Sequence, residues 1–200
     1  MHLLIDAIIQ IIILTIIPCI WWSIIDRKQS SFFNWIGLKK PRVKNKQKYA
    51  ISFILMTFMS IIPIFLVFPL LTNTTEVVTS QFAGQGVSAL IPALIWSFFQ
   101  TGLSEEIFFR GFVAKRLINK FGFDIGNGIQ GLLFGLMHGI FLISVTGALW
   151  AVIIVTFTGV SGWLSGWINE KLSDGSIVSS WLLHGMGNII VSIAAMYNLI

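Results

Sequence analysis

Long apolar stretches separated by short polar connections run through the whole chain. Six of them approach the roughly 20 apolar residues that a helix needs to cross a bilayer. They cover residues 3–25, 49–71, 89–109, 125–143, 147–168 and 177–199. The fourth is the least apolar, and only residues 144–146 separate it from the fifth, so one bent or re-entrant hairpin over 125–168 is the alternative. The pattern predicts an all-α, polytopic membrane bundle of about six transmembrane helices.

Composition supports the membrane assignment. The 200 residues are 56% hydrophobic and only 10% charged, whereas soluble domains carry about 25% charged residues. The single cysteine, Cys19, excludes an intramolecular disulfide and a cysteine-based metal site. We divide the chain into N-terminal membrane helices with a basic loop, residues 1–88, and a core, residues 89–200, which carries the candidate chemistry.

Positive charge is concentrated in two places. Eight of the thirteen Lys and Arg residues lie in 27–48 and four more in 110–120, whereas the loop 72–88 has none. An excess of Lys and Arg marks the cytoplasmic side of a membrane protein. With the N-terminus outside, both clusters and the connection 169–176 become cytoplasmic. The charges therefore predict that both termini lie outside.

The connections between spans carry their own expectations. The Lys-rich loop 27–48 is predicted to contact anionic lipid headgroups of the inner leaflet, and not nucleic acid. Residues 111–122 form an amphipathic pattern that is predicted to lie as a separate helix on the inner surface. Trp35 and Trp181 are predicted to anchor the chain at the membrane interfaces.

Small and polar residues interrupt the apolar stretches. Gly131, Gly135 and Gly139 recur every four residues, a spacing that lets helices pack closely. Asn127 and Asn169 are predicted to be loop or cap residues, because short polar side chains favour helix ends.

Two adjacent carboxylates, Glu105 and Glu106, stand inside the third stretch and are followed by Arg110. An ionised side chain at bilayer depth costs about 2.5–3.5 kcal/mol on insertion scales, which makes it a candidate for function. Glu106 and Arg110 are four residues apart, so they share a helix face and can form a supporting ion pair. Glu105 points about 100° away and stays free for chemistry.

Two of the three histidines, His138 and His184, also fall in apolar stretches, and Asn188 follows His184 by four residues. A carboxylate with two imidazoles and an amide can supply a general base for water and donors for an oxyanion. Glu105, His138 and His184 could equally be three ligands of a zinc ion with an open water position. The His-Glu-x-x-His signature of many zinc proteases is absent from the sequence.

Glu105 and His138 can act together only if they lie at the same depth in the membrane. Glu105 is predicted near the inner end of its helix, whereas His138 lies about 13 residues into the fourth span, roughly 20 Å from its start. We therefore expect the fourth helix to begin inside a cytoplasmic vestibule near Gln130.

Three motifs carry a family resemblance. They are Glu105-Glu106-Ile-Phe-Phe-Arg110, Phe134-Gly-Leu-Met-His138 and His184-Gly-Met-Gly-Asn188. Together they resemble the signature of the CAAX protease and bacteriocin-processing (CPBP, or Abi) family, which includes the Ras-converting CAAX prenyl endopeptidases. The resemblance covers roughly residues 100–190. It implies an all-helical intramembrane endopeptidase with residues 89–200 as its catalytic core.

The resemblance also implies roles for single residues. In that family the first Glu and the first His activate water, and the second His and the Asn form the oxyanion hole. These roles carry over to Glu105, His138, His184 and Asn188. Family members are described both as metalloproteases and as metal-independent glutamate peptidases. No further carboxylate stands out near the histidines, which favours the glutamate mechanism without a cofactor over a zinc enzyme.

The expected setting is a bacterial cell membrane, because the chain is small, positive inside and without a eukaryotic targeting sequence. The expected partner is a hydrophobic or lipidated peptide substrate. In bacteria the family is associated with bacteriocin processing and self-immunity, and by analogy we expect such a role.

Two other functions fit the sequence. A non-enzymatic membrane immunity or scaffold protein would use the polar cluster only for structure. An ion-coupled transporter would use intramembrane Glu and His residues as relays. The small size and the absence of duplicated halves disfavour the transporter.

Overall fold

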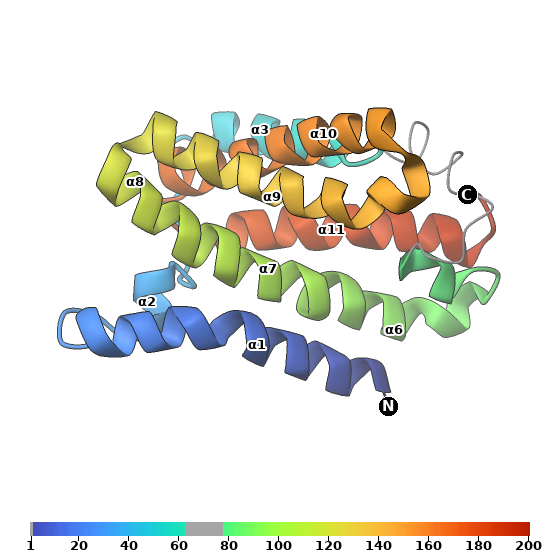
Figure 1. The fold of residues 1–200 in the computed structure, drawn as a ribbon, viewed down its shortest axis with the longest axis horizontal. Coiled ribbons are helices and arrows are strands. Elements are labelled where there is room, and N and C mark those ends of the chain that lie inside the picture. The colour runs from blue at the N-terminus through green and yellow to red at the C-terminus, as the bar shows by residue number, and fades with distance from the viewer. Residues whose placement is uncertain (1, 63–77) are drawn as a thin grey trace.

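The computed structural model describes residues 2–62 and 78–200, and these residues form helices, turns and loops without a strand. The long helices lie roughly side by side along the long axis of the molecule (Figure 1). They are α1 (His2–Ile25), a composite third-span helix (Gly86–Phe121), α9 (Phe123–Thr146), α10 (Ala148–Trp167) and α11 (Val178–Met196). In the described part of the chain, five helices are long and apolar enough to cross a membrane. The predicted all-α, polytopic membrane bundle is confirmed.

Shorter elements connect the first and third spans. They are α2 (Phe32–Ile36), α3 (Lys46–Met59) and the 3-10 turns Val78–Phe82 and Gly86–Ala89. The side chain of Asn45 starts α3 by accepting a hydrogen bond from the backbone N–H of Lys48 at 2.9 Å. The second predicted span, 49–71, extends beyond the described residues, so only its first part is seen as helix.

The third span is longer than predicted because helix continues to Phe121. It consists of the turn Gly86–Ala89, α6 (Leu90–Leu94), a π-helix (Ile95–Leu103), α7 (Ser104–Glu106), a second π-helix (Ile107–Ala114) and α8 (Lys115–Phe121). The prediction of a separate surface helix over 111–122 is therefore wrong. The helix ends at Gly122, whose φ is 80°.

This extension explains how His138 reaches the level of Glu105. Sixteen residues separate Glu105 from Phe121, and fifteen separate the start of α9 at Phe123 from His138. Helix α9 runs back along α8 (Figure 1). Helix segments of nearly equal length therefore lead away from Glu105 and back to His138. Helix α9 begins at Phe123, two residues before the predicted span 125–143, and not inside a vestibule near Gln130.

Glycines bring α9 and α10 into close contact. A Cβ atom at Gly135 would lie 2.3 Å from the backbone oxygen of Val155. The connection is a single residue, Gly147, at φ 78°, which permits the sharp reversal. The two helices have 24 and 20 residues, so each can cross a bilayer and the chain forms two separate helices here.

Asn127 and Asn169 are buried between helices, so the prediction of Asn127 as a loop or cap residue is wrong, whereas Asn169 accepts from the backbone N–H of Ser180 in the first turn of α11 and does act as a cap. Asn127 has 0% exposure, and its side chain donates to the carbonyl oxygen of Trp163 at 2.8 Å. Asn169 is 1% exposed and hydrogen-bonds to Ser180. Buried amides are tolerated in an apolar interior because these hydrogen bonds replace water.

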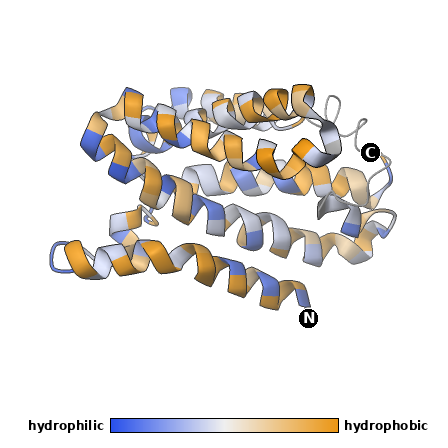
Figure 2. Cartoon of the chain, in the orientation of Figure 1, coloured by the Kyte–Doolittle hydropathy of each residue, from blue (hydrophilic) through white to orange (hydrophobic). Residues whose placement is uncertain are grey.

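Hydrophilic residues collect at the end of the bundle that holds α2 and α8, whereas apolar residues cover most of α1 (Figure 2). Trp35 belongs to this polar end and is buried, and its predicted place at the membrane interface stays a prediction. Its indole donates to Asp26 at 2.6 Å, and the guanidinium of Arg116 lies 3.9 Å from its ring centre. Both chain termini lie at the opposite end of the bundle (Figure 1). The side of the membrane that each end faces stays a prediction.

Helix α1 supports the third span from its lipid-facing side. The side chain of Gln10 donates to Ser104 Oγ at 3.3 Å and accepts from Gln100 at 3.4 Å. These bonds hold α1 against the segment that leads into the two glutamates.

Candidate active site

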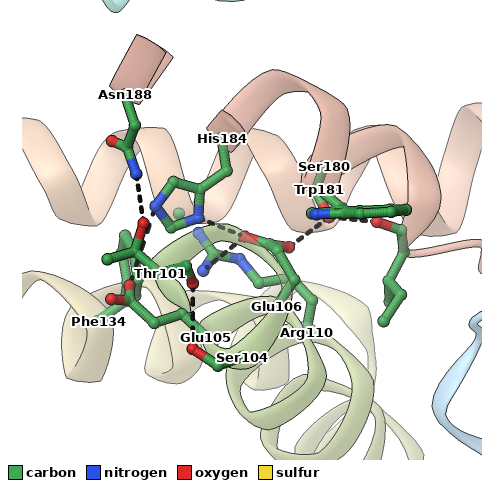
Figure 3. A network of polar contacts seen from close by, with 12 residues as sticks. Thr101, Ser104, Glu105, Glu106, Arg110, Phe134, Ser180, Trp181, His184 and Asn188 are labelled. Carbon is green, nitrogen blue, oxygen red and sulfur yellow. Dashed lines mark hydrogen bonds and ion pairs between the residues drawn. The ribbon is translucent and has the colours of Figure 1, made fainter. Parts of the chain in front are cut away.

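Three helical segments meet at the polar centre of the bundle. Glu105 and Glu106 come from α7, between the two π-helices, His138 comes from α9, and His184 and Asn188 come from α11. Figure 3 shows the α7 and α11 side chains turned toward one another. Wide π turns recur at functional sites, where they change which side chains point to a neighbouring helix.

Glu106 is the buried anchor of the site, with no exposed surface. The predicted ion pair is present, with Arg110 Nη1 at 3.1 Å from Oε1. The same oxygen lies 3.2 Å from Nδ1 of His184. The hydroxyl of Ser180 donates to the other oxygen, Oε2. The interactions with His184 and Ser180 were not predicted, because they depend on how α11 packs against α7.

His184 lies between the two carboxylates. An ionised carboxylate only accepts hydrogen bonds, so Nδ1 of His184 carries a hydrogen and donates to Glu106. The other ring nitrogen, Nε2, lies 3.9 Å from Oε2 of Glu105. That oxygen is buried and has no hydrogen-bond partner among the described residues. Glu105 is therefore the less constrained carboxylate, as the sequence predicted.

His138 is connected to the rest of the site by the ring of Phe134, which contacts both histidines. Its Nδ1 lies 2.9 Å from the Phe134 carbonyl oxygen, which can only accept, so Nδ1 carries a hydrogen. In the neutral ring Nε2 then has a free lone pair. The Phe134 ring centre lies 4.5 Å from that of His138, 6.1 Å from that of His184 and 4.0 Å from the Arg110 guanidinium. Both imidazoles and the Arg110 guanidinium thus pack around the apolar ring of Phe134.

Asn188 is held by a residue that the sequence analysis missed. Its amide nitrogen donates to Thr101 Oγ1 at 2.8 Å, and Thr101 in turn donates to the Trp96 carbonyl at 3.1 Å. One amide hydrogen of Asn188 remains for another acceptor. Thr101 precedes Glu105 by four residues, and this spacing on a helix was the sequence signal for it.

Trp181 lies beside the site, and its predicted place at a membrane interface stays a prediction. Its indole donates to the Phe98 carbonyl oxygen at 2.5 Å. Phe98 is within the first π-helix, where wider turns leave carbonyl groups accessible to side chains.

The residues present do not form a zinc site in this arrangement. A zinc ion needs three protein ligands at about 2.0–2.2 Å. Among the described residues, no three His, Cys, Asp or Glu side chains are placed to hold a metal ion. We therefore assign no catalytic step to a metal.

The described helices thus bring two glutamates, two histidines and an asparagine together inside a bundle of apolar helices. Comparison with protein families matches residues 87–190, slightly more than half of the chain, to the type II CAAX prenyl endopeptidase Rce1-like family. The chain belongs to this family, which confirms the resemblance seen in the sequence. Family membership indicates CAAX-type intramembrane protease activity. No curated protein and no solved structure matches the chain.

Proposed function

We propose that the protein is an intramembrane endopeptidase of the glutamate type, in which Glu105 and His138 activate water and His184 and Asn188 bind the oxyanion. One observation carries the proposal: the unpaired carboxylate oxygen of Glu105 lies 3.9 Å from Nε2 of His184. A base and a donor so close together can act on the two sides of one scissile carbonyl.

The water step uses the free oxygen of Glu105. Glu105 takes a proton as the water oxygen bonds to the carbonyl carbon, and Nε2 of His138 accepts the second water hydrogen as a hydrogen bond. The resulting tetrahedral oxyanion collapses with cleavage of the C–N bond. The proton on Glu105 passes to the amine nitrogen as the C–N bond breaks, so the amine leaves neutral and the carboxylate is regenerated.

The oxyanion step requires hydrogens on His184 and Asn188. Nδ1 of His184 already donates to Glu106, so Nε2 can donate only when the ring is an imidazolium. Glu106 on one side and Glu105 on the other stabilise that cation. Asn188 contributes the amide hydrogen that Thr101 leaves free. The two histidines thus have opposite tasks, His138 as acceptor and His184 as donor.

The substrate that we propose is a membrane-associated or hydrophobic peptide, since the site lies within apolar spans. The proposed setting is a bacterial cell membrane with both termini outside, where the enzyme acts in bacteriocin processing or self-immunity. Seven of the eight basic residues in the loop 27–48 are exposed, which supports contact with anionic headgroups of the inner leaflet.

Proteolysis by the purified protein in liposomes tests the function. Wild type, Glu105→Ala and His184→Ala are compared on a library of farnesylated and unmodified hydrophobic peptides, with and without a chelator. We expect cleavage by wild type that both substitutions abolish and that the chelator leaves unchanged. Loss of cleavage with chelator and its return with zinc would replace the glutamate mechanism by a metalloprotease. Equal cleavage by Glu105→Ala would contradict the proposal.

A further inference from the structure

Ser180 lies one helical turn before His184 on α11, and it has no exposed surface. Its hydroxyl donates to Oε2 of Glu106, whereas Nδ1 of His184 lies 3.2 Å from Oε1. Helix α11 therefore contacts both oxygens of one carboxylate. Two hydrogen bonds to different oxygens fix the rotation of the Glu106 carboxylate about its last bond, which a single contact would leave free.

Asn169 holds Ser180 from the other side. It lies in the π-helical turn Ile168–Leu172 and is 1% exposed. Its amide nitrogen donates to Ser180 Oγ at 2.7 Å, and its amide oxygen accepts from the Ser180 backbone N–H at 3.2 Å. That N–H is in the first turn of α11, where backbone donors have no partner within the helix. Asn169 therefore caps α11 and also fixes the position of the Ser180 hydroxyl.

The hydroxyl hydrogen of Ser180 has two acceptors within reach. One is Glu106, and the other is the carbonyl oxygen of Ile177 at 3.1 Å. The charged carboxylate is the stronger acceptor. With Asn169 donating to Oγ, the oxygen stays where its hydrogen can reach Glu106.

We propose that Ser180 and Asn169 are positioning residues that hold the Glu106 carboxylate against Nδ1 of His184 and so aim Nε2 at the reacting carbonyl. Neither residue touches the substrate. The inference rests on the proposed function, because aiming His184 matters for peptide hydrolysis only if His184 binds the oxyanion.

The neighbouring Ser179 provides a matched control. It is also fully buried, but its Oγ accepts from the hydroxyl of Tyr49 on α3 at 3.0 Å. Ser179→Ala and Ser180→Ala therefore remove the same atom from adjacent buried positions. Only Ser180→Ala removes a bond to Glu106.

The first readout is the ¹⁵N NMR spectrum of the histidine rings in the full-length protein in detergent. The chain has only three histidines, and the His184 signals are assigned by their loss in His184→Gln. We expect Ser180→Ala to shift the His184 ring signals and to leave those of His138 in place. Ser179→Ala should leave both unchanged, and Ser180→Thr, which keeps a hydroxyl, should restore the His184 signals.

The second readout is peptide cleavage. We expect Ser180→Ala to lower kcat by about 10- to 100-fold, the range for one hydrogen bond to a charged group, with KM changed less than about twofold. Asn169→Ala should also lower kcat. It replaces Ser180→Ala in the test if that variant does not fold. Unchanged His184 signals in Ser180→Ala and Asn169→Ala, or an equal change in Ser179→Ala, would overturn the inference. Because the spectra need no substrate, inactivity of the wild type would contradict the proposed function and leave this test intact.

Discussion

Nδ1 of His184 lies 3.2 Å from Oε1 of Glu106, so the second glutamate of the pair orients this imidazole. Nε2 of the same ring faces the first glutamate, Glu105, at 3.9 Å. The two neighbouring carboxylates therefore have different tasks, which single substitutions can separate.

Glu106→Gln should destabilise the protein, whereas Glu105→Gln should not. Glu106 is the ionised partner of Arg110, whose side chain is 3% exposed. Leaving one charge of a buried pair without its partner costs about 3–5 kcal/mol. Thermal unfolding in detergent, followed by tryptophan fluorescence, measures the difference. Equal melting temperatures for the two variants would show that Glu106 does not stabilise the bundle.

Thr101→Val should lower kcat because it removes the acceptor that orients the Asn188 amide. We expect a loss of about tenfold, smaller than the roughly 10²- to 10³-fold loss typical of removing an oxyanion donor, as in Asn188→Ala. Thr158→Val is the control, since its hydroxyl bonds only to the Ile154 carbonyl of its own helix. A Thr101→Val enzyme as active as the control would remove Thr101 from the site.

Gly135→Ala should loosen the contact between α9 and α10. The added Cβ would lie 2.3 Å from the Val155 oxygen, whereas a Cβ at Gly128 on the same helix meets nothing within 4 Å. Overpacking of this kind costs about 1–3 kcal/mol. Gly128→Ala should be neutral or stabilising, because alanine favours helix by up to about 1 kcal/mol. The melting temperatures of the two variants in detergent check this, and an unaffected Gly135→Ala would contradict the close packing.

Local spacing was enough to find part of the site. The four-residue spacing of Glu106 and Arg110 predicted their ion pair, and the apolar surroundings of Glu105, His138 and His184 marked them as candidates. The contacts of His184 with Glu106 and of Asn169 with Ser180 depend on how separate helices pack, which local spacing does not define. The same reason explains why the burial of Asn127 and Asn169 between helices was not predicted.

The sequence pattern also did not predict that the third-span helix continues to Phe121. The amphipathic residues 111–122 suit both a surface helix and the end of a long one. The structure shows the second, because Gly122 is the first residue to leave the helical conformation. The π turns on both sides of Glu105 were not predicted from the sequence pattern.

The orientation in the membrane is testable with single cysteines. In a Cys19→Ser background, Lys44→Cys places a thiol at an exposed position in the basic loop, and Ser88→Cys places one at an exposed position in the first turn of the third span. Because the basic loop is predicted to be cytoplasmic, an impermeant maleimide applied to intact cells should label Ser88→Cys and spare Lys44→Cys. The reverse pattern would invert the topology.

The most direct test of the account is the rate at which Glu105→Gln cleaves a peptide that the wild type cleaves, measured under single-turnover conditions at equal amounts of folded protein. The amide keeps the size of the side chain and loses the base. We expect a rate at least about 10²- to 10⁴-fold lower, the contribution typical of a general base. A rate within tenfold of the wild type would contradict the assignment of Glu105 as the group that activates water.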